Sequence, residues 1–194
     1  MIVKLSQIIT KFLDRNISIE SDMIDIYQYG IEITLSSMLN ITLVLLAAVL
    51  TGNIFTGIVF LAVFISLRSF TGGYHATTYV RCNTVMIITF IIVKVMSEWL
   101  FVQSTTIKLL IVSICILPVI IYAPVKNAHK ELSESQRKSN YMISIVSYTI
   151  ISAVSIVLLN CDIKYGSIII ATLTVISAMI LIEVFMQRRG YHEC

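Results

Sequence analysis

Six long apolar runs dominate this sequence and restrict what it can fold into. Each is close to the roughly 17–20 residues that cross a hydrocarbon core of about 30 Å as a helix. The predicted spans are 32–50, 54–70, 85–102, 107–122, 142–159 and 167–186. An open sheet would leave its edge groups unpaired in lipid, and the runs lack the two-residue alternation of a barrel strand. We therefore expect an all-α polytopic membrane protein with six transmembrane helices.

The composition agrees with this fold class. Hydrophobic residues make up 57% of the chain and charged residues 13%, whereas a soluble domain has about 25% charged residues. The sidedness of Lys and Arg described below is enough to explain the formal net charge of +3, so no nucleic-acid partner is expected.

Residues 1–31 are predicted to form an amphipathic N-terminal segment. Charged residues are scattered through it, and no compact apolar run with a cleavage site marks a signal peptide. Its apolar positions repeat with helical spacing, in the two sets Ile2, Leu5, Ile9, Phe12, Leu13 and Met23, Ile26, Tyr27, Ile31. Such helices lie either on the membrane surface or against the bundle. The remaining organisation is a six-helix domain at 32–186 and a C-terminal tail at 187–194.

The distribution of Lys and Arg predicts the topology, because positively charged flanks of short loops stay in the cytoplasm. With both termini cytoplasmic, the inside positions are Lys4, Lys11, Arg15, Arg68, Arg81, Lys126, Lys130, Arg137, Lys138, Arg188 and Arg189. Lys164 then lies in an outer loop, and the outer connections are too short to hold a domain. We expect function within the membrane or at the cytoplasmic loops 71–84 and 123–141.

The first of these loops contains His75 and Cys82. A free thiol has a pKa of about 8.5 and is mostly protonated at neutral pH, but an adjacent imidazole can accept its proton and produce a nucleophile. In an unbroken helix, seven steps would separate the two Cα atoms by roughly 10 Å. A break at Gly72 and Gly73 would let the side chains meet. From the residues alone, a Cys–His nucleophile and a merely solvated polar loop both remain open.

The other polar residues suggest structural roles. The four cysteines fall on different sides of the membrane, so no disulfide set is expected, and Cys115 is predicted to pack as a small apolar residue. His75 and Cys82 are too few for a stable metal site. Lys94 and Glu98 are four residues apart and are expected to pair on one helix face.

The pattern around the second loop resembles the accessory gene regulator B (AgrB) family of membrane peptidases in Gram-positive quorum sensing. The resemblance rests on Arg68, the run Gly72-Gly73-Tyr74-His75-Ala76, a Cys seven residues after the His, and Tyr122-Ala123-Pro124 before a Lys-containing loop. It implies that His75 and Cys82 are the catalytic pair and that Arg68 and Gly73 match positions important for processing. It also implies a homodimer, and a precursor peptide substrate with an amphipathic leader and an acidic C-terminal tail.

The resemblance also implies a mechanism. Cys82 cuts off the tail and holds the core peptide as a thioester, and a side chain of the peptide then displaces Cys82 to close a thiolactone or lactone ring. No cofactor is expected, since exchange of thioesters needs no nucleotide and the chain has no Walker motif.

Supporting or substrate-binding roles fall to Arg68, Gly72, Gly73, Glu32, Glu183, Lys126 and Lys130. Glu32 and Glu183 are candidates to orient His75, although each alternatively borders the lipid headgroups. Lys126 and Lys130 either attract the acidic tail or anchor the loop inside the cell. The rival functions are a substrate-binding membrane subunit of a vitamin transporter, which would place its polar contacts on the outer side, and a scaffold or sensor.

Overall fold

The computed structural model describes residues 2–17, 23–72, 78–125, 133–161 and 163–189. These residues form seven helices and no strand, which confirms the all-α class. The helices are α1 (Ile2–Ile17), α2 (Ile24–Leu50), α3 (Ile54–Thr71), α4 (Tyr79–Val102), α5 (Thr105–Tyr122), α6 (Glu134–Asn160) and α7 (Tyr165–Arg188). The six helices from α2 to α7 are long and apolar enough to cross a membrane.

Helix α7 is the centre of the bundle. It packs against α3, α4, α5 and α6, and its buried side chains run from Ser167 to Glu183. Aromatic rings of α3 and α4 complete the core, with the Phe60 ring 5.2 Å from that of Phe64 and 5.5 Å from that of Phe90.

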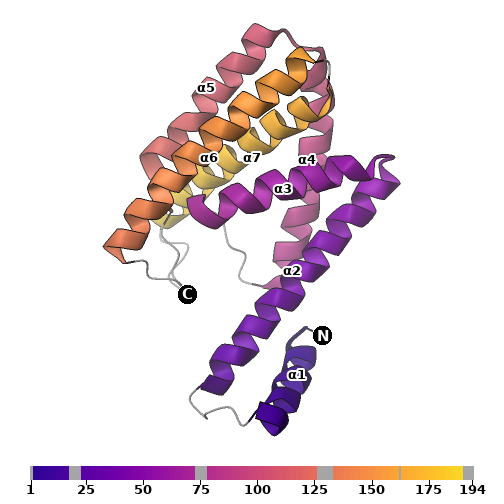
Figure 1. Ribbon diagram of the computed structural model, residues 1–194, viewed down its shortest axis with the longest axis vertical. Helices are drawn as coiled ribbons and strands as arrows, with labels where there is room; N and C mark the ends of the chain where they lie inside the picture. Colours follow the sequence, from indigo (N-terminus) through magenta and orange to yellow (C-terminus); the bar gives the residue numbers. More distant parts are fainter. Residues whose placement is uncertain (1, 18–22, 73–77, 126–132, 162, 190–194) are drawn as a thin grey trace.

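Helix α2 extends beyond the other spans at its N-terminal end, where α1 lies against it (Figure 1). The amphipathic segment thus includes a separate helix, α1, and the first turns of α2, which continue without a break into the apolar run. Along the rest of its length, α2 packs against α3 and α4. This arrangement connects α1 to the bundle mainly through α2.

Several helices begin earlier than the apolar runs predict, because their polar first turns are also helical. Side-chain caps define several starts: Asn53 accepts a hydrogen bond from the Phe55 N–H, Thr78 from the Arg81 N–H, and Ser133 forms a capping box with Gln136. The largest shifts are α2, which starts at Ile24 rather than 32, and α6, which starts at Glu134 rather than 142; α4 starts at Tyr79 rather than 85.

Glycines allow two helix pairs to approach closely. A Cβ on Gly166 would lie 2.5 Å from the Ser155 carbonyl oxygen of α6, and one on Gly57 would lie 2.6 Å from the Ala48 Cβ of α2. Small residues at such contacts are the usual means by which membrane helices pack.

Two expectations for structural residues are confirmed. Lys94 Nζ lies 3.0 Å from Glu98 Oε1, so these charges pair within α4. Cys115 is partly buried against the core. Cys82, Cys115 and Cys161 carry free thiols, and Cys194 lies outside the described residues.

Candidate active site

Cys82 lies in the first turn of α4, half-buried, at the end of the molecule where α3 and α7 finish. Its backbone N–H donates to the Thr78 carbonyl, and the Thr78 hydroxyl caps the same turn by accepting from the Arg81 N–H. The preceding helix has already ended at Thr71. The predicted break between the second and third spans is thus confirmed at Gly72 and Thr78, and Cys82 starts the third span as expected.

Asn40 of α2 reaches the thiol. Its Nδ2 donates a hydrogen bond to Cys82 Sγ at 3.8 Å, and its Oδ1 is buried and has no partner among the described residues. Asn40 was not among the site residues predicted from the sequence. A signal was available, because Glu32, Ser36 and Asn40 repeat every four residues and form a polar stripe on one face of an otherwise apolar helix.

Arg68 brings positive charge to this end of the molecule. Its guanidinium interacts electrostatically with both Cys82 and Glu183. The same group lies 5.5 Å from the centre of the Phe64 ring, and its Nη1 contacts Met179 Sδ at 3.9 Å. Arg68 is therefore seated against α7, one turn from the buried Glu183, whose Oε1 accepts from Gln187 Nε2 at 3.0 Å.

Glu32 is buried, and its carboxylate accepts hydrogen bonds from three side chains. Oε1 accepts from the Ser6 hydroxyl at 3.0 Å and from Gln28 Nε2 at 3.1 Å, and Oε2 accepts from the Tyr79 hydroxyl at 2.7 Å. These contacts give the Glu32 carboxylate partners within the protein, while its predicted role in orienting His75 stays a prediction. The Tyr79 hydroxyl thus joins the first residue of α4 to α2. Glu32 positions α1 and α4 on α2.

Gly72 is required by its surroundings. It ends α3 with φ +70°, a conformation that other L residues rarely adopt. A Cβ here would lie 2.9 Å from the Val125 carbonyl oxygen, while the Val125 N–H donates to the Thr71 carbonyl at 3.0 Å. The end of α3 is thereby attached to the segment that follows α5.

The remaining predicted site residues are His75, Gly73, Lys126 and Lys130, and they lie outside the described residues. Their roles stay predictions. Among the described residues the structure brings Cys82, Arg68 and Glu183 together electrostatically, with Gly72 at the end of the Arg68 helix. Within the same part of the chain, no group of three His, Cys, Asp or Glu side chains is arranged to hold a metal ion.

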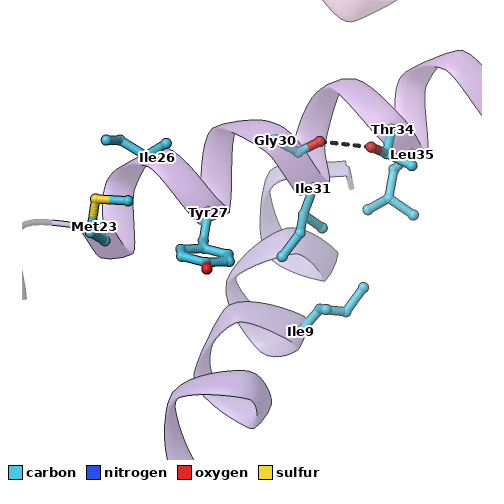
Figure 2. A pocket seen from close by; sticks show the side chains of 8 residues that line it. All are labelled: Ile9, Met23, Ile26, Tyr27, Gly30, Ile31, Thr34 and Leu35. Carbon is cyan, nitrogen blue, oxygen red and sulfur yellow. Dashed lines mark hydrogen bonds between the residues drawn. The ribbon is translucent and has the colours of Figure 1, made fainter. Parts of the chain in front are cut away.

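An apolar groove of about 490 Å³ lies between α1 and the first half of α2. Figure 2 shows Ile9 of α1 opposite the side chains of α2 that line it. The lining residues are Ile9, Met23, Ile26, Tyr27, Gly30, Ile31, Thr34 and Leu35. The lining contains no Cys, His, Asp, Glu, Lys or Arg, so the cluster around Cys82 remains the better candidate site.

The chain matches the Accessory gene regulator B family over residues 6–186 of its 194 residues. It belongs to the AgrB family. No curated protein and no solved structure matches it. AgrB membership together with six apolar helices identifies a multi-pass membrane protein of quorum sensing, and it fits a role in peptide processing.

Gly72→Ala should destabilise the protein more than Gly52→Ala. Both glycines have positive φ, at +70° and +89°, but only Gly72 has a neighbour within 4 Å of an added Cβ. The difference between the two variants therefore isolates the clash with the Val125 carbonyl, which we expect to cost about 1–3 kcal/mol. Thermal unfolding in detergent measures it, and equal losses in both variants would show that the close approach is unimportant.

Tyr79→Phe should loosen the first turn of α4. A hydrogen bond to a charged acceptor contributes about 1.5–3 kcal/mol, and this variant removes one from Glu32 without changing the ring. We expect a lower unfolding temperature and faster iodoacetamide alkylation of Cys82, measured with Cys115, Cys161 and Cys194 replaced by Ala. Tyr27→Phe is the matched control on exposed α2 surface; a Tyr79 variant that behaves like it refutes the positioning role.

Proposed function

We propose that this protein is a membrane-embedded cysteine endopeptidase that removes the C-terminal tail of a quorum-sensing precursor peptide and helps to cyclise the remaining core. The observation that carries the proposal is the position of Cys82. Its free thiol stands in the first turn of α4, beside Asn40 and within electrostatic range of Arg68, in a chain of the AgrB family.

The cleavage step uses the sulfur as nucleophile. His75 accepts the thiol proton of Cys82, Sγ attacks the carbonyl carbon before the tail, a C–S bond forms, and the carbonyl oxygen takes the displaced electron pair. When this intermediate collapses, the C–N bond breaks and the leaving amine takes a proton, which we assign to His75. The products are the free tail and a thioester between the core peptide and Cys82.

The cyclisation step exchanges the acyl group. A thiol or hydroxyl of the core peptide attacks the thioester, the C–S bond to Cys82 breaks, and the Cys82 thiol is restored as a thiolactone or lactone closes. Replacing one thioester by another is nearly balanced in free energy, whereas forming a thioester from an amide is uphill. Departure of the tail and exclusion of water from the acyl-enzyme therefore have to draw the reaction forward.

The remaining assignments complete the proposal. The site faces the cytoplasm, where the short loops carry most of the Lys and Arg. Lys126 and Lys130 attract the acidic tail, Glu183 and Arg68 support the catalytic loop, and the active form is a homodimer. The vitamin-transporter alternative receives no specific support, since the polar cluster contains a nucleophile and lies at the end where α3 and α7 finish.

Cys82→Ser and His75→Ala should each abolish cleavage of a co-expressed precursor peptide without reducing membrane insertion. Both side chains are needed to form and use one thiolate, so either loss removes the acyl-enzyme. Immunoblotting of the precursor measures cleavage, and mass spectrometry of the wild-type protein should find the thioester on Cys82. The matched control replaces Cys115, Cys161 and Cys194 together by Ala and should retain activity. A dead triple variant combined with an active Cys82→Ala would overturn the assignment.

Labelling of intact cells tests the cytoplasmic placement. An impermeant maleimide added outside should modify Cys161, which is exposed in the connection between α6 and α7, and should spare Cys82 until the membrane is opened. Single-cysteine variants read by mass shift separate the two positions. Rapid labelling of Cys82 from outside contradicts the topology and, with it, entry of the precursor from the cytoplasm.

A further inference from the structure

The polar stripe of α2 ends at the nucleophile. Glu32, Ser36 and Asn40 share one face of the helix; Glu32 and Ser36 are buried and Asn40 is half-buried. Polar side chains that face the interior of a membrane bundle are costly and usually serve function. Glu32 already has three hydrogen-bond donors that explain its place. Asn40 has no comparable structural explanation.

The side-chain amide of Asn40 has only part of the hydrogen bonds that it can form. Its Nδ2 donates to Cys82 Sγ at 3.8 Å, and its buried Oδ1 has no partner in the part of the chain that is described. A buried amide oxygen without a partner is uncommon in folded proteins and calls for an explanation, of which a catalytic role is one. The only heteroatom of a described residue that the Asn40 amide contacts is the sulfur that reacts.

We propose that Asn40 is a catalytic residue whose Nδ2 donates a hydrogen bond to the oxyanion formed when Cys82 attacks the precursor peptide. This inference rests on the proposed function. In that step the C–S bond forms and the carbonyl π electrons move to oxygen, so a full negative charge appears on the oxygen. The same charge forms again when a peptide side chain attacks the thioester, so one donor serves both steps.

The geometry suits this role. The oxyanion is bonded to the carbon that the sulfur has just attacked, and it therefore lies close to Sγ. A donor that rests 3.8 Å from Sγ needs only a small shift to reach the distance of about 2.7–3.1 Å at which such a donor stabilises an oxyanion. Arg68 is less suited, since its guanidinium is seated against the Phe64 ring and Met179.

The energetics favour the transition state over the resting enzyme. Sulfur of a thiol is a weak acceptor, so the resting contact contributes little, whereas a hydrogen bond to an anionic oxygen is much stronger. An interaction that strengthens only as charge develops raises kcat and leaves KM nearly unchanged. The Asn40 amide is neutral, so no unpaired charge has to be held in the membrane before substrate arrives.

Kinetics of Asn40→Leu test the proposal, because leucine keeps a similar shape and removes the amide. We use purified protein in liposomes, a synthetic precursor peptide as substrate, and Cys115, Cys161 and Cys194 replaced by Ala. We expect kcat for tail removal to fall about 10²–10³-fold with KM within about threefold. The rate of Cys82 alkylation by iodoacetamide should stay within about threefold, since that displacement forms no oxyanion. The matched control is Asn83→Leu. The Asn83 Oδ1 is likewise buried without a partner among the described residues, but its amide is not hydrogen-bonded to Sγ, so this variant should process the peptide at nearly the wild-type rate.

Two outcomes overturn the role of Asn40: unchanged kcat in Asn40→Leu, or alkylation that slows in proportion to processing, which would place the effect on the thiol itself. If Asn40→Leu fails to insert, Asn40→Ala gives the same test, because it removes the amide donor without adding a charge or bulk beside Cys82. Cys82→Ala distinguishes failure of the proposed function from failure of the role of Asn40. A Cys82→Ala protein that still cuts the peptide refutes the proposed function, whereas an inactive Cys82→Ala beside a fully active Asn40→Leu refutes only the role of Asn40.

Discussion

The buried carboxylate of Glu32 is the constraint on which the Cys82 end of the molecule depends. Its three donors come from α1, α2 and α4, and its oxygens only accept, as an ionised carboxylate does. Removing water from a carboxylate is expensive, so these donors are required once the group is buried. Because one donor is Tyr79, the first residue of α4, the same contacts hold the turn that carries Cys82 against α2, where Asn40 lies.

A second attachment holds the end of α3, on the other side of residues 73–77. Gly72 ends α3 against the backbone of Val125, and the hydrogen bond between Val125 and Thr71 joins this point to the segment after α5. Two unrelated contacts thus hold the residues on either side of 73–77, one through α2 and the other through the segment that follows α5. Such anchoring is what a site needs when its reactive groups must meet within a fraction of an ångström, because loops alone position side chains less accurately than helices.

The sequence predicted the membrane helices well because apolar length is a direct measure of the hydrocarbon thickness. It predicted the starts of α2, α4 and α6 poorly, since the polar first turns of these helices stay helical beyond the apolar runs. The Lys94–Glu98 pair was predictable because it depends only on spacing within one helix. The partners of Glu32 were not, because they depend on how α1 and α4 pack against α2. Asn40 was within reach of sequence reasoning through the four-residue repeat of the polar stripe.

The outcome of the proposed reaction is decided by which nucleophile reaches the thioester first. A side chain of the bound core peptide is already tethered to the acyl group, and well-oriented intramolecular attack has effective molarities of about 10⁵–10⁸ M. Water competes only if it enters, and Cys82 is half-buried at the start of a membrane helix with apolar spans on either side. An oxyanion donor supplied from within the bundle stabilises attack by either nucleophile equally, so it raises the rate without choosing the product. Selection of the ring over the hydrolysed peptide therefore has to come from exclusion of water and from the fold of the bound peptide.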